Sequence, residues 1–209
     1  MQKGRVLSLR SFGILEFFKT NSFLLTVTLV FTVGFFIGIF LENNFSFLKT
    51  YSQDYITDYI LIRSSASFGR VFIHSLFEFL SVLFLLFLLG ASLFGVVTVP
   101  SVLIIKGVLQ GGVMAYLYSA YSLKGIAFNA VIIIPPILIF LIIMIFGSRE
   151  SIRLSLKFSS LTLPKTLPIN LSDDFKDYTL KYFVLALSTV VSALIDAIIS
   201  TGLIKHFTL

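Results

Sequence analysis

The sequence contains no cysteine and no tryptophan, and only two of its 209 residues are histidines. Without cysteine, the chain forms no disulfide, thiolate metal site, cysteine nucleophile or C-x-x-C redox pair. No Ser/His/Asp or Glu/His grouping is present, and neither a Walker loop nor a G-x-G-x-x-G fingerprint occurs. His74 has no second histidine at metal-binding spacing. We therefore expect no enzyme activity, no catalytic residue, no metal site and no cofactor.

Charged residues are also scarce. They make up 12% of the chain, against about 25% in soluble domains, whereas 57% of the residues are hydrophobic and 24 are phenylalanine. This composition predicts an all-α, polytopic membrane helix bundle, because a helix satisfies its own backbone hydrogen bonds in lipid. The net charge of +6 comes from basic residues scattered beside the apolar segments. That distribution fits the positive-inside rule and does not indicate a nucleic-acid partner.

Five apolar segments predict transmembrane helices, because about 20 residues at about 1.5 Å each cross a hydrocarbon core of about 30 Å. Between residues 79 and 123 the only charge is Lys106, so a hairpin near Lys106 is the simplest arrangement. The third segment is short and glycine-rich, so it is either a tilted helix or partly re-entrant. The predicted spans are about residues 20–41, 79–100, 105–123, 125–148 and 180–203.

Two polar segments separate these spans. Residues 42–78 carry apolar side chains at steps of three or four residues, which predicts an amphipathic helix resting on the membrane surface or the bundle. Residues 149–178 begin with a basic stripe suited to lipid phosphates. The repeated residues are Leu48, Tyr51, Tyr55, Tyr59 and Ile62 in the first segment, and Arg149, Arg153 and Lys157 in the second.

The distribution of basic residues predicts the topology of a multi-pass protein of the plasma membrane. Residues 1–20 are basic and form either a short surface helix or a flank that sets orientation. This places the N-terminus and the loop 149–178 in the cytoplasm. The insertion 42–78 and the C-terminus are then extracytoplasmic.

Small and helix-breaking residues recur with a joint spacing in the second half of the chain. The pattern comprises Gly90-x4-Gly95, Pro100, Lys106-Gly107-x3-Gly111, Lys124-Gly125 and Pro135, followed by the basic stripe. The last span adds Ser192-Ala193-x2-Asp196-Ala197. This combination resembles the stage II sporulation protein M family of integral membrane proteins.

The resemblance implies a five-span bundle that acts as a non-enzymatic scaffold. In spore formers, the family member recruits peptidoglycan-degrading partners to the septum during engulfment. Membrane or wall-associated proteins are therefore the partners that the resemblance implies, beside the lipid bilayer and a second copy of the chain. The expected role is the anchoring of partners for remodelling of the cell envelope.

Asp196 is the most informative single residue, because an acid in a membrane span costs about 2.5–3.5 kcal/mol on insertion scales. Three interpretations remain open for it. The carboxylate bonds to the backbone opened at Pro135 and Pro136 or to a lysine, it holds a proton or cation on a transport path, or it contacts the span of a partner.

For the other candidate residues, a structural role in anchoring or packing the helices is the first interpretation. Lys106 and Lys124 are expected to anchor opposite ends of the third span. Pro135-Pro136 predicts a kink, and the glycines predict close helix packing. The alternative is a small transporter or channel-like permease that uses Asp196 and the broken central helices. The remaining candidates are Gly90, Gly95, Gly107, Gly111 and Gly125.

Overall fold

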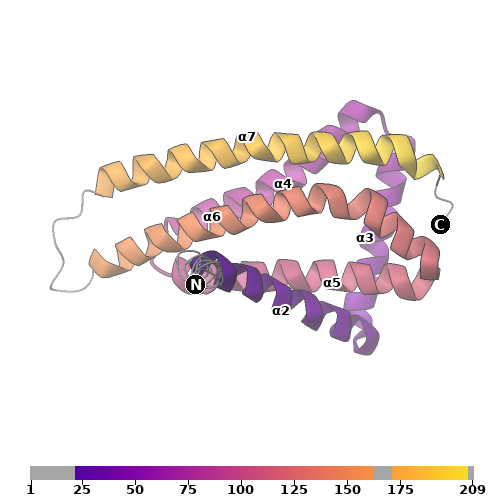
Figure 1. Cartoon of the computed structure of the whole chain (residues 1–209), viewed down its shortest axis with the longest axis horizontal. Coiled ribbons are helices and arrows are strands. Elements are labelled where there is room, and N and C mark those ends of the chain that lie inside the picture. The colour runs from indigo at the N-terminus through magenta and orange to yellow at the C-terminus, as the bar shows by residue number, and fades with distance from the viewer. Residues whose placement is uncertain (1–21, 162–170, 207–209) are drawn as a thin grey trace, which may run out of the picture.

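The computed structural model describes residues 22–161 and 171–206, and its regular structure in these ranges is helical (Figure 1). The all-α fold predicted from composition is confirmed. The basic flank predicted at residues 1–20 lies outside the described residues. The long helices are α2 (Ser22–Asn44), α4 (Phe68–Gly90), α5 (Gly95–Phe128), α6 (Ile134–Leu161) and α7 (Leu171–Leu203). The shorter elements are α3 (Ser46–Ser65), the π-helix η1 (Asn129–Ile133) and the 3-10 helix η2 (Ile204–His206).

Within the described ranges, four helices are long and apolar enough to cross a membrane. One of them has 66 residues, Gly95–Ser160, and joins α5, η1 and α6. It folds back on itself at a kink at Ser122, so each of its two arms exceeds the length of about 20 residues that one crossing needs. The others are α2, α4 and Ser172–Leu203. The chain is thus a multi-pass membrane protein.

The reversal at Ser122 depends on an unusual backbone conformation and a nearby glycine. Ser122 has φ 51° and ψ −128°, a backbone conformation that residues other than glycine rarely adopt. A Cβ atom on Gly125 would lie 1.9 Å from the carbonyl oxygen of Leu117. Gly125 therefore permits the close return of the chain, and Lys124 lies exposed beside it.

The structure corrects the predicted position of the preceding turn. No hairpin forms near Lys106, which lies well inside α5. The turn instead occupies residues 91–94, between Gly90 at the end of α4 and Gly95 at the start of α5. The prediction of a short or re-entrant third span is also wrong. Helix α5 runs from Gly95 to its kink, with Pro100 inside it.

The second span also begins earlier than the sequence predicted. It begins at Phe68 rather than near residue 79, so residues 68–78 belong to a membrane-length helix and not to the polar insertion. Because Arg70, His74 and Glu78 are polar, this segment was assigned to the polar insertion. They recur every four residues on α4, so a single face of the helix carries them.

Glycines let α2 and α5 touch backbone to backbone. A Cβ atom on Gly107 would lie 2.4 Å from the carbonyl oxygen of Phe31, and one on Gly111 would lie 2.0 Å from that of Phe35. The contact is reciprocal, because Cβ atoms on Gly34 and Gly38 of α2 would lie 2.5 and 2.1 Å from carbonyl oxygens of α5. This is the close approach that small residues allow between helices in lipid.

The π-helix η1 ends just before Pro135 and Pro136, which are in the first turn of α6. A proline nitrogen cannot donate a backbone hydrogen bond, so the ladder must open at this point. Figure 1 shows that the chain bends at this end of α6. The carbonyl of Pro136 accepts a hydrogen bond from the hydroxyl of Ser192 on α7 at 2.7 Å.

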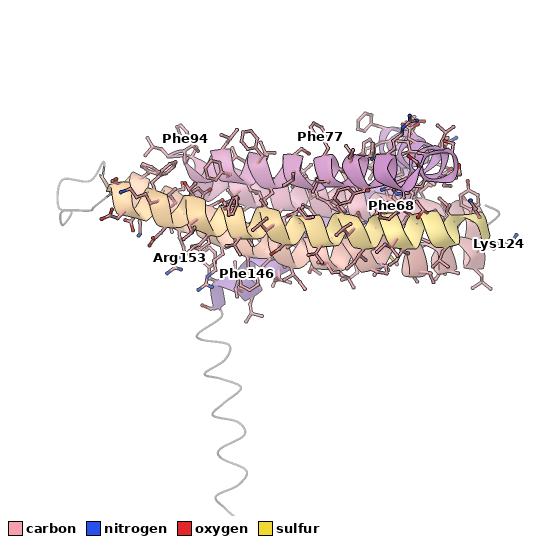
Figure 2. The ribbon with its side chains drawn as sticks, turned by 90° about the horizontal axis from the view of Figure 1, so that it is seen from above. Phe68, Phe77, Phe94, Lys124, Phe146 and Arg153 are labelled. Carbon is pink, nitrogen blue, oxygen red and sulfur yellow. The ribbon has the colours of Figure 1, made fainter. Side chains whose placement is uncertain are left out.

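The long helices present aromatic side chains outward between two charged ends (Figure 2). Phe77 on α4 is 77% exposed and Phe94 in the following turn is 75% exposed, as expected of surfaces that face lipid. Lys124 and Arg153 lie toward opposite ends of the bundle (Figure 2). Helix α3 crosses the Lys124 end at a steep angle to the long helices (Figure 1).

Candidate functional site

The site centres on Asp196, a fully buried acid on α7. Its Oδ2 atom lies 2.6 Å from Nη2 of Arg63, which comes from the last turn of α3. Both side chains are only 2% exposed. The pair therefore ties the helix that crosses the end of the bundle to the last membrane span.

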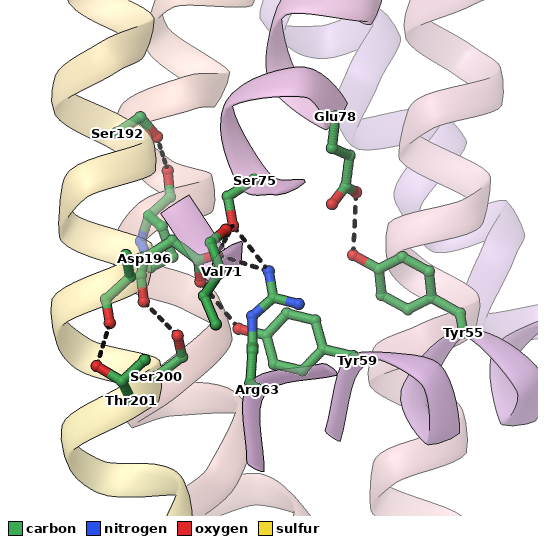
Figure 3. A network of polar contacts seen from close by, with 12 residues as sticks. Tyr55, Tyr59, Arg63, Val71, Ser75, Glu78, Ser192, Asp196, Ser200 and Thr201 are labelled. Atoms are coloured by element: carbon green, nitrogen blue, oxygen red, sulfur yellow. Dashed lines mark hydrogen bonds and ion pairs between the residues drawn. The ribbon is translucent and has the colours of Figure 1, made fainter. Parts of the chain in front are cut away.

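Two hydroxyl groups complete this ionic cluster (Figure 3). The hydroxyl of Tyr59 donates to Oδ1 of Asp196 at 3.0 Å. Ser75 on α4 also donates to Oδ2, and its Oγ accepts a hydrogen bond from Nη2 of Arg63 at 3.1 Å. Arg63, Tyr59, Ser75 and Asp196 are hereafter the ionic cluster, and they join α3, α4 and α7.

Tyr59 supports the charges in a second way. Its ring centroid lies 3.5 Å from Cζ of Arg63, so the guanidinium rests on the aromatic face. Burial raises the pKa of Tyr59 well above its ordinary value. The hydroxyl therefore keeps its proton and remains a donor to the carboxylate.

The local sequence explains how α3 reaches this position. Tyr51, Tyr55, Tyr59 and Arg63 are spaced by four residues, so they share one face of the helix. The three rings form a row, with centroids 6.4 and 6.2 Å apart. The row ends at Arg63, whose guanidinium rests on the ring of Tyr59.

A cleft lies beside the ionic cluster, with an empty volume of about 620 Å³ that includes its opening. Besides the cluster, its polar lining consists of Tyr55 from α3, Glu78 from α4, and Lys106 and Gln110 from α5. Tyr55 donates a hydrogen bond to Glu78 at 3.2 Å across this space (Figure 3). Among the described residues, no group of three or more His, Cys, Asp or Glu side chains forms a metal site.

The structure decides among the bonds predicted for Asp196. The described hydrogen bonds of its carboxylate go to side chains of the ionic cluster and not to the backbone at the prolines. It is Ser192, one turn earlier on α7, that donates to the carbonyl of Pro136. The cationic partner is also not a lysine but Arg63. Arginine suits this buried position, since its charge persists and its planar group satisfies several acceptors at once.

The other candidate residues are not members of the ionic cluster. Lys106 lines the cleft instead of ending a span, and Lys124 is exposed at the α5–α6 reversal. Gly107 and Gly111 serve the contact with α2. Gly125 belongs to the reversal.

Gly90 and Gly95 lie at the opposite end of the bundle, next to a second buried cluster. A Cβ atom on Gly90 would lie 2.3 Å from the hydroxyl oxygen of Tyr178. Ser151 donates to the carbonyl of Leu86 at 2.8 Å, and its Oγ lies 2.5 Å from the hydroxyl of Tyr182. Ser151, Tyr178 and Tyr182 are hereafter the hydroxyl cluster.

Sequence reasoning did not identify Arg63, Ser75 or Glu78 as site residues. A signal for Arg63 was present, because it is the fourth member of the four-residue series that contains the tyrosines. An acid in a span also requires a partner of opposite charge. Ser75 carried no signal, since many serines occur in apolar helices.

A model of the family described as Stage II sporulation protein M matches residues 27–201. The matched region contains all four residues of the ionic cluster. No curated protein and no solved structure matches the chain.

Proposed function

The chain belongs to the stage II sporulation protein M family, as its residue pattern predicted, and we propose that it is a non-enzymatic membrane scaffold. In this proposal it anchors membrane or wall-associated partner proteins for remodelling of the cell envelope. The observation that supports the proposal is the attachment of α3 across the end of the bundle by a buried ion pair. Such an attachment holds a polar surface helix in a fixed position.

The outer face of α3 is suited to contact a partner. Asp54 and Asp58 are exposed and lie one turn apart, and Leu61 beside them is 62% exposed. Two acids next to an exposed apolar side chain form a surface that a basic, partly apolar protein segment complements. We propose that this face, named here the α3 surface, receives the partner.

The proposed orientation places the α3 surface outside the cytoplasmic membrane, together with the C-terminus. Basic residues in the N-terminal 20 residues and in the segment 149–178 then lie in the cytoplasm, as the positive-inside rule requires. The cysteine-free chain makes a direct test simple. Single cysteines at Thr57 and Lys176, both exposed, should react with an impermeant thiol reagent from opposite sides of the membrane.

Recovery of partners from the native host tests the scaffold proposal. The tagged full chain, purified in mild detergent, should retain wall-modifying or membrane proteins. Charge reversal in Asp54→Lys/Asp58→Lys should lower their recovery by at least tenfold. The matched control is Lys176→Glu, a charge reversal at the other end of the bundle, which should leave recovery unchanged.

Two results would contradict the proposal. One is recovery of the same partners by the α3 variant and the wild type. The other is the absence of partners together with substrate-dependent flux in proteoliposomes, which would favour the transporter alternative. Self-association through the lipid-facing aromatic surface is part of the proposal, and the mass of the complex in detergent measures it.

A further inference from the structure

We propose that the cleft beside the ionic cluster binds an amphipathic zwitterion, a molecule with an anionic group, an ammonium group and an apolar part. The cleft lies between α2, α4, α5 and α6, with α3 closing one end. This binding site is independent of the scaffold role proposed above, because none of the residues of the α3 surface lines it.

The first observation is a pair of opposite charges at mid-span. Glu78 lies near the middle of α4, and Lys106 lies well inside the first arm of α5. Among the described residues, neither forms an ion pair within 4.0 Å. Charges at this depth are costly and as a rule either pair or serve a function. Two opposite charges that line one cleft without joining each other leave room for a ligand between them.

The second observation is an incompletely bonded arginine. Arg63 is buried, and its Nε has no hydrogen-bond partner among the described residues. Asp196 and Ser75 hold the side chain through Nη2 alone. Figure 3 shows the remaining terminal nitrogen directed to the side on which Tyr55 and Glu78 lie. A buried donor without a partner requires an explanation, and a ligand atom in the cleft supplies one.

The types of polar group specify the ligand chemistry. Lys106 and Gln110 are one turn apart on α5 and both line the cleft, so the same helix face offers two donors to a phosphate or carboxylate. The carboxylate of Glu78 is an acceptor for an ammonium group. Arg63 and Lys106 balance Asp196 and Glu78, so a ligand without net charge leaves the buried site neutral.

The walls of the cleft favour an amphipathic molecule. Ligand sites are typically lined by apolar side chains with a few polar groups placed among them, and this cleft has that composition. Most of the lining is apolar and suits a hydrocarbon chain or ring. The apolar walls include Phe79, Val82, Ile137, Phe140 and Leu141. A phosphoethanolamine lipid combines all three features, and a water-soluble zwitterion supplies the two charges alone.

Native mass spectrometry of the full chain, stripped of lipid in detergent, tests the proposal. The added lipids are phosphatidylethanolamine, phosphatidylglycerol, which lacks the ammonium group, and diacylglycerol, which lacks both charges. The zwitterionic lipid should bind at least tenfold more tightly than the other two. Glu78→Gln and Lys106→Met should each remove this preference, while Lys124→Met, a cation outside the cleft, should retain it.

A second arm identifies the source of the zwitterion. Glycerophosphoethanolamine, which is water-soluble, is added at millimolar concentration while thermal unfolding is followed. Stabilisation that requires Lys106 supports a soluble ligand, whereas tight binding of the lipid alone supports a membrane lipid. Equal binding of all three lipids and no response to the soluble compound would overturn the proposal.

Folding and scaffold function are controlled separately. Glu78→Asp and Lys106→Arg keep the charges, so they should recover most of the preference if the variants fold. Wild-type binding by both Glu78→Gln and Lys106→Met would also overturn the proposal. Partner recovery by these variants should equal that of the wild type, which separates a failure here from a failure of the scaffold proposal.

Discussion

The two ends of the bundle are held by buried polar clusters of different chemistry. At one end the hydroxyl cluster is uncharged and bonds to backbone carbonyls, as Tyr178 does with Phe87 at 2.9 Å and Tyr182 with Gly147 at 3.0 Å. At the other end the ionic cluster bonds side chain to side chain, through Arg63 and Asp196. Both clusters connect α4 to α7, but loss of a partner should cost more free energy in the ionic cluster than in the hydroxyl cluster.

The comparison shows what each cluster is for. Hydroxyl groups that satisfy carbonyls stabilise helices that already pack along their length, as α4, α6 and α7 do. Helix α3 packs chiefly on α5 and has only limited contact with α7. Its attachment to the last span therefore depends on the ion pair. Loss of charge should release α3, whereas loss of a hydroxyl should only weaken the bundle.

The largest effect is expected from Asp196→Asn. This change leaves the buried Arg63 without its counter-charge, and breaking a buried pair in this way costs about 3–5 kcal/mol. Unfolding in detergent should therefore occur at markedly lower denaturant concentration, while membrane insertion is kept. Replacement of both partners, in Arg63→Met/Asp196→Leu, should restore most of the stability, since well-packed apolar residues replace buried pairs at little cost. A double variant as unstable as the single one would contradict this explanation.

A smaller loss is expected from Tyr59→Phe. The variant removes one hydrogen bond to a charged group, a contribution of about 1.5–3 kcal/mol, and keeps the ring under Arg63. Its effect should disappear when it is measured in the Arg63→Met/Asp196→Leu background. The same loss in both backgrounds would contradict this explanation, because the hydroxyl would then contribute without its bond to Asp196.

Tyr182→Phe tests the hydroxyl cluster at the other end of the bundle. It removes neutral hydrogen bonds to Gly147 and Ser151, so the free energy of unfolding should fall by only about 1 kcal/mol. Proteolysis of α3 should not change. If this variant released α3, the two clusters would not be the independent units described here.

The smallest effect, with the opposite sign, is expected from Ser122→Gly at the reversal of α5. Glycine adopts a positive φ at little cost, so the variant should gain about 1 kcal/mol of stability. Thermal unfolding measures the gain. Ser119→Gly, in the regular part of the same helix, is the matched control and should lose stability.

Much of this architecture could be predicted from the sequence. Hydropathy indicated a helical membrane bundle, and the spacing around Lys106 and Gly107 indicated the family that the comparison then showed. The turn at residues 91–94 was misplaced because a charged residue was taken as the end of a span. Lys106 lines a cleft instead, and only tertiary packing creates that polar environment.

The site was predictable only in part. Asp196 was identified because an acid in a span is costly. Its partner Arg63 lies more than 130 residues earlier on a surface helix, and periodicity along one helix does not show which other helix that face meets. The same limit applies to Ser75, whose hydroxyl becomes significant only when α4 brings it against the carboxylate.

Hydrogen exchange across α3 is the most direct test of the account, because it measures whether the ion pair holds this helix in place. In the wild type, the backbone amides of α3 should exchange as slowly as those of neighbouring helices. In Asp196→Asn, exchange in α3 should accelerate at least tenfold while α4 to α7 stay protected, and partner recovery should fall in parallel. Unchanged protection of α3 in this variant would contradict the claim that the Arg63–Asp196 pair fixes the scaffold surface.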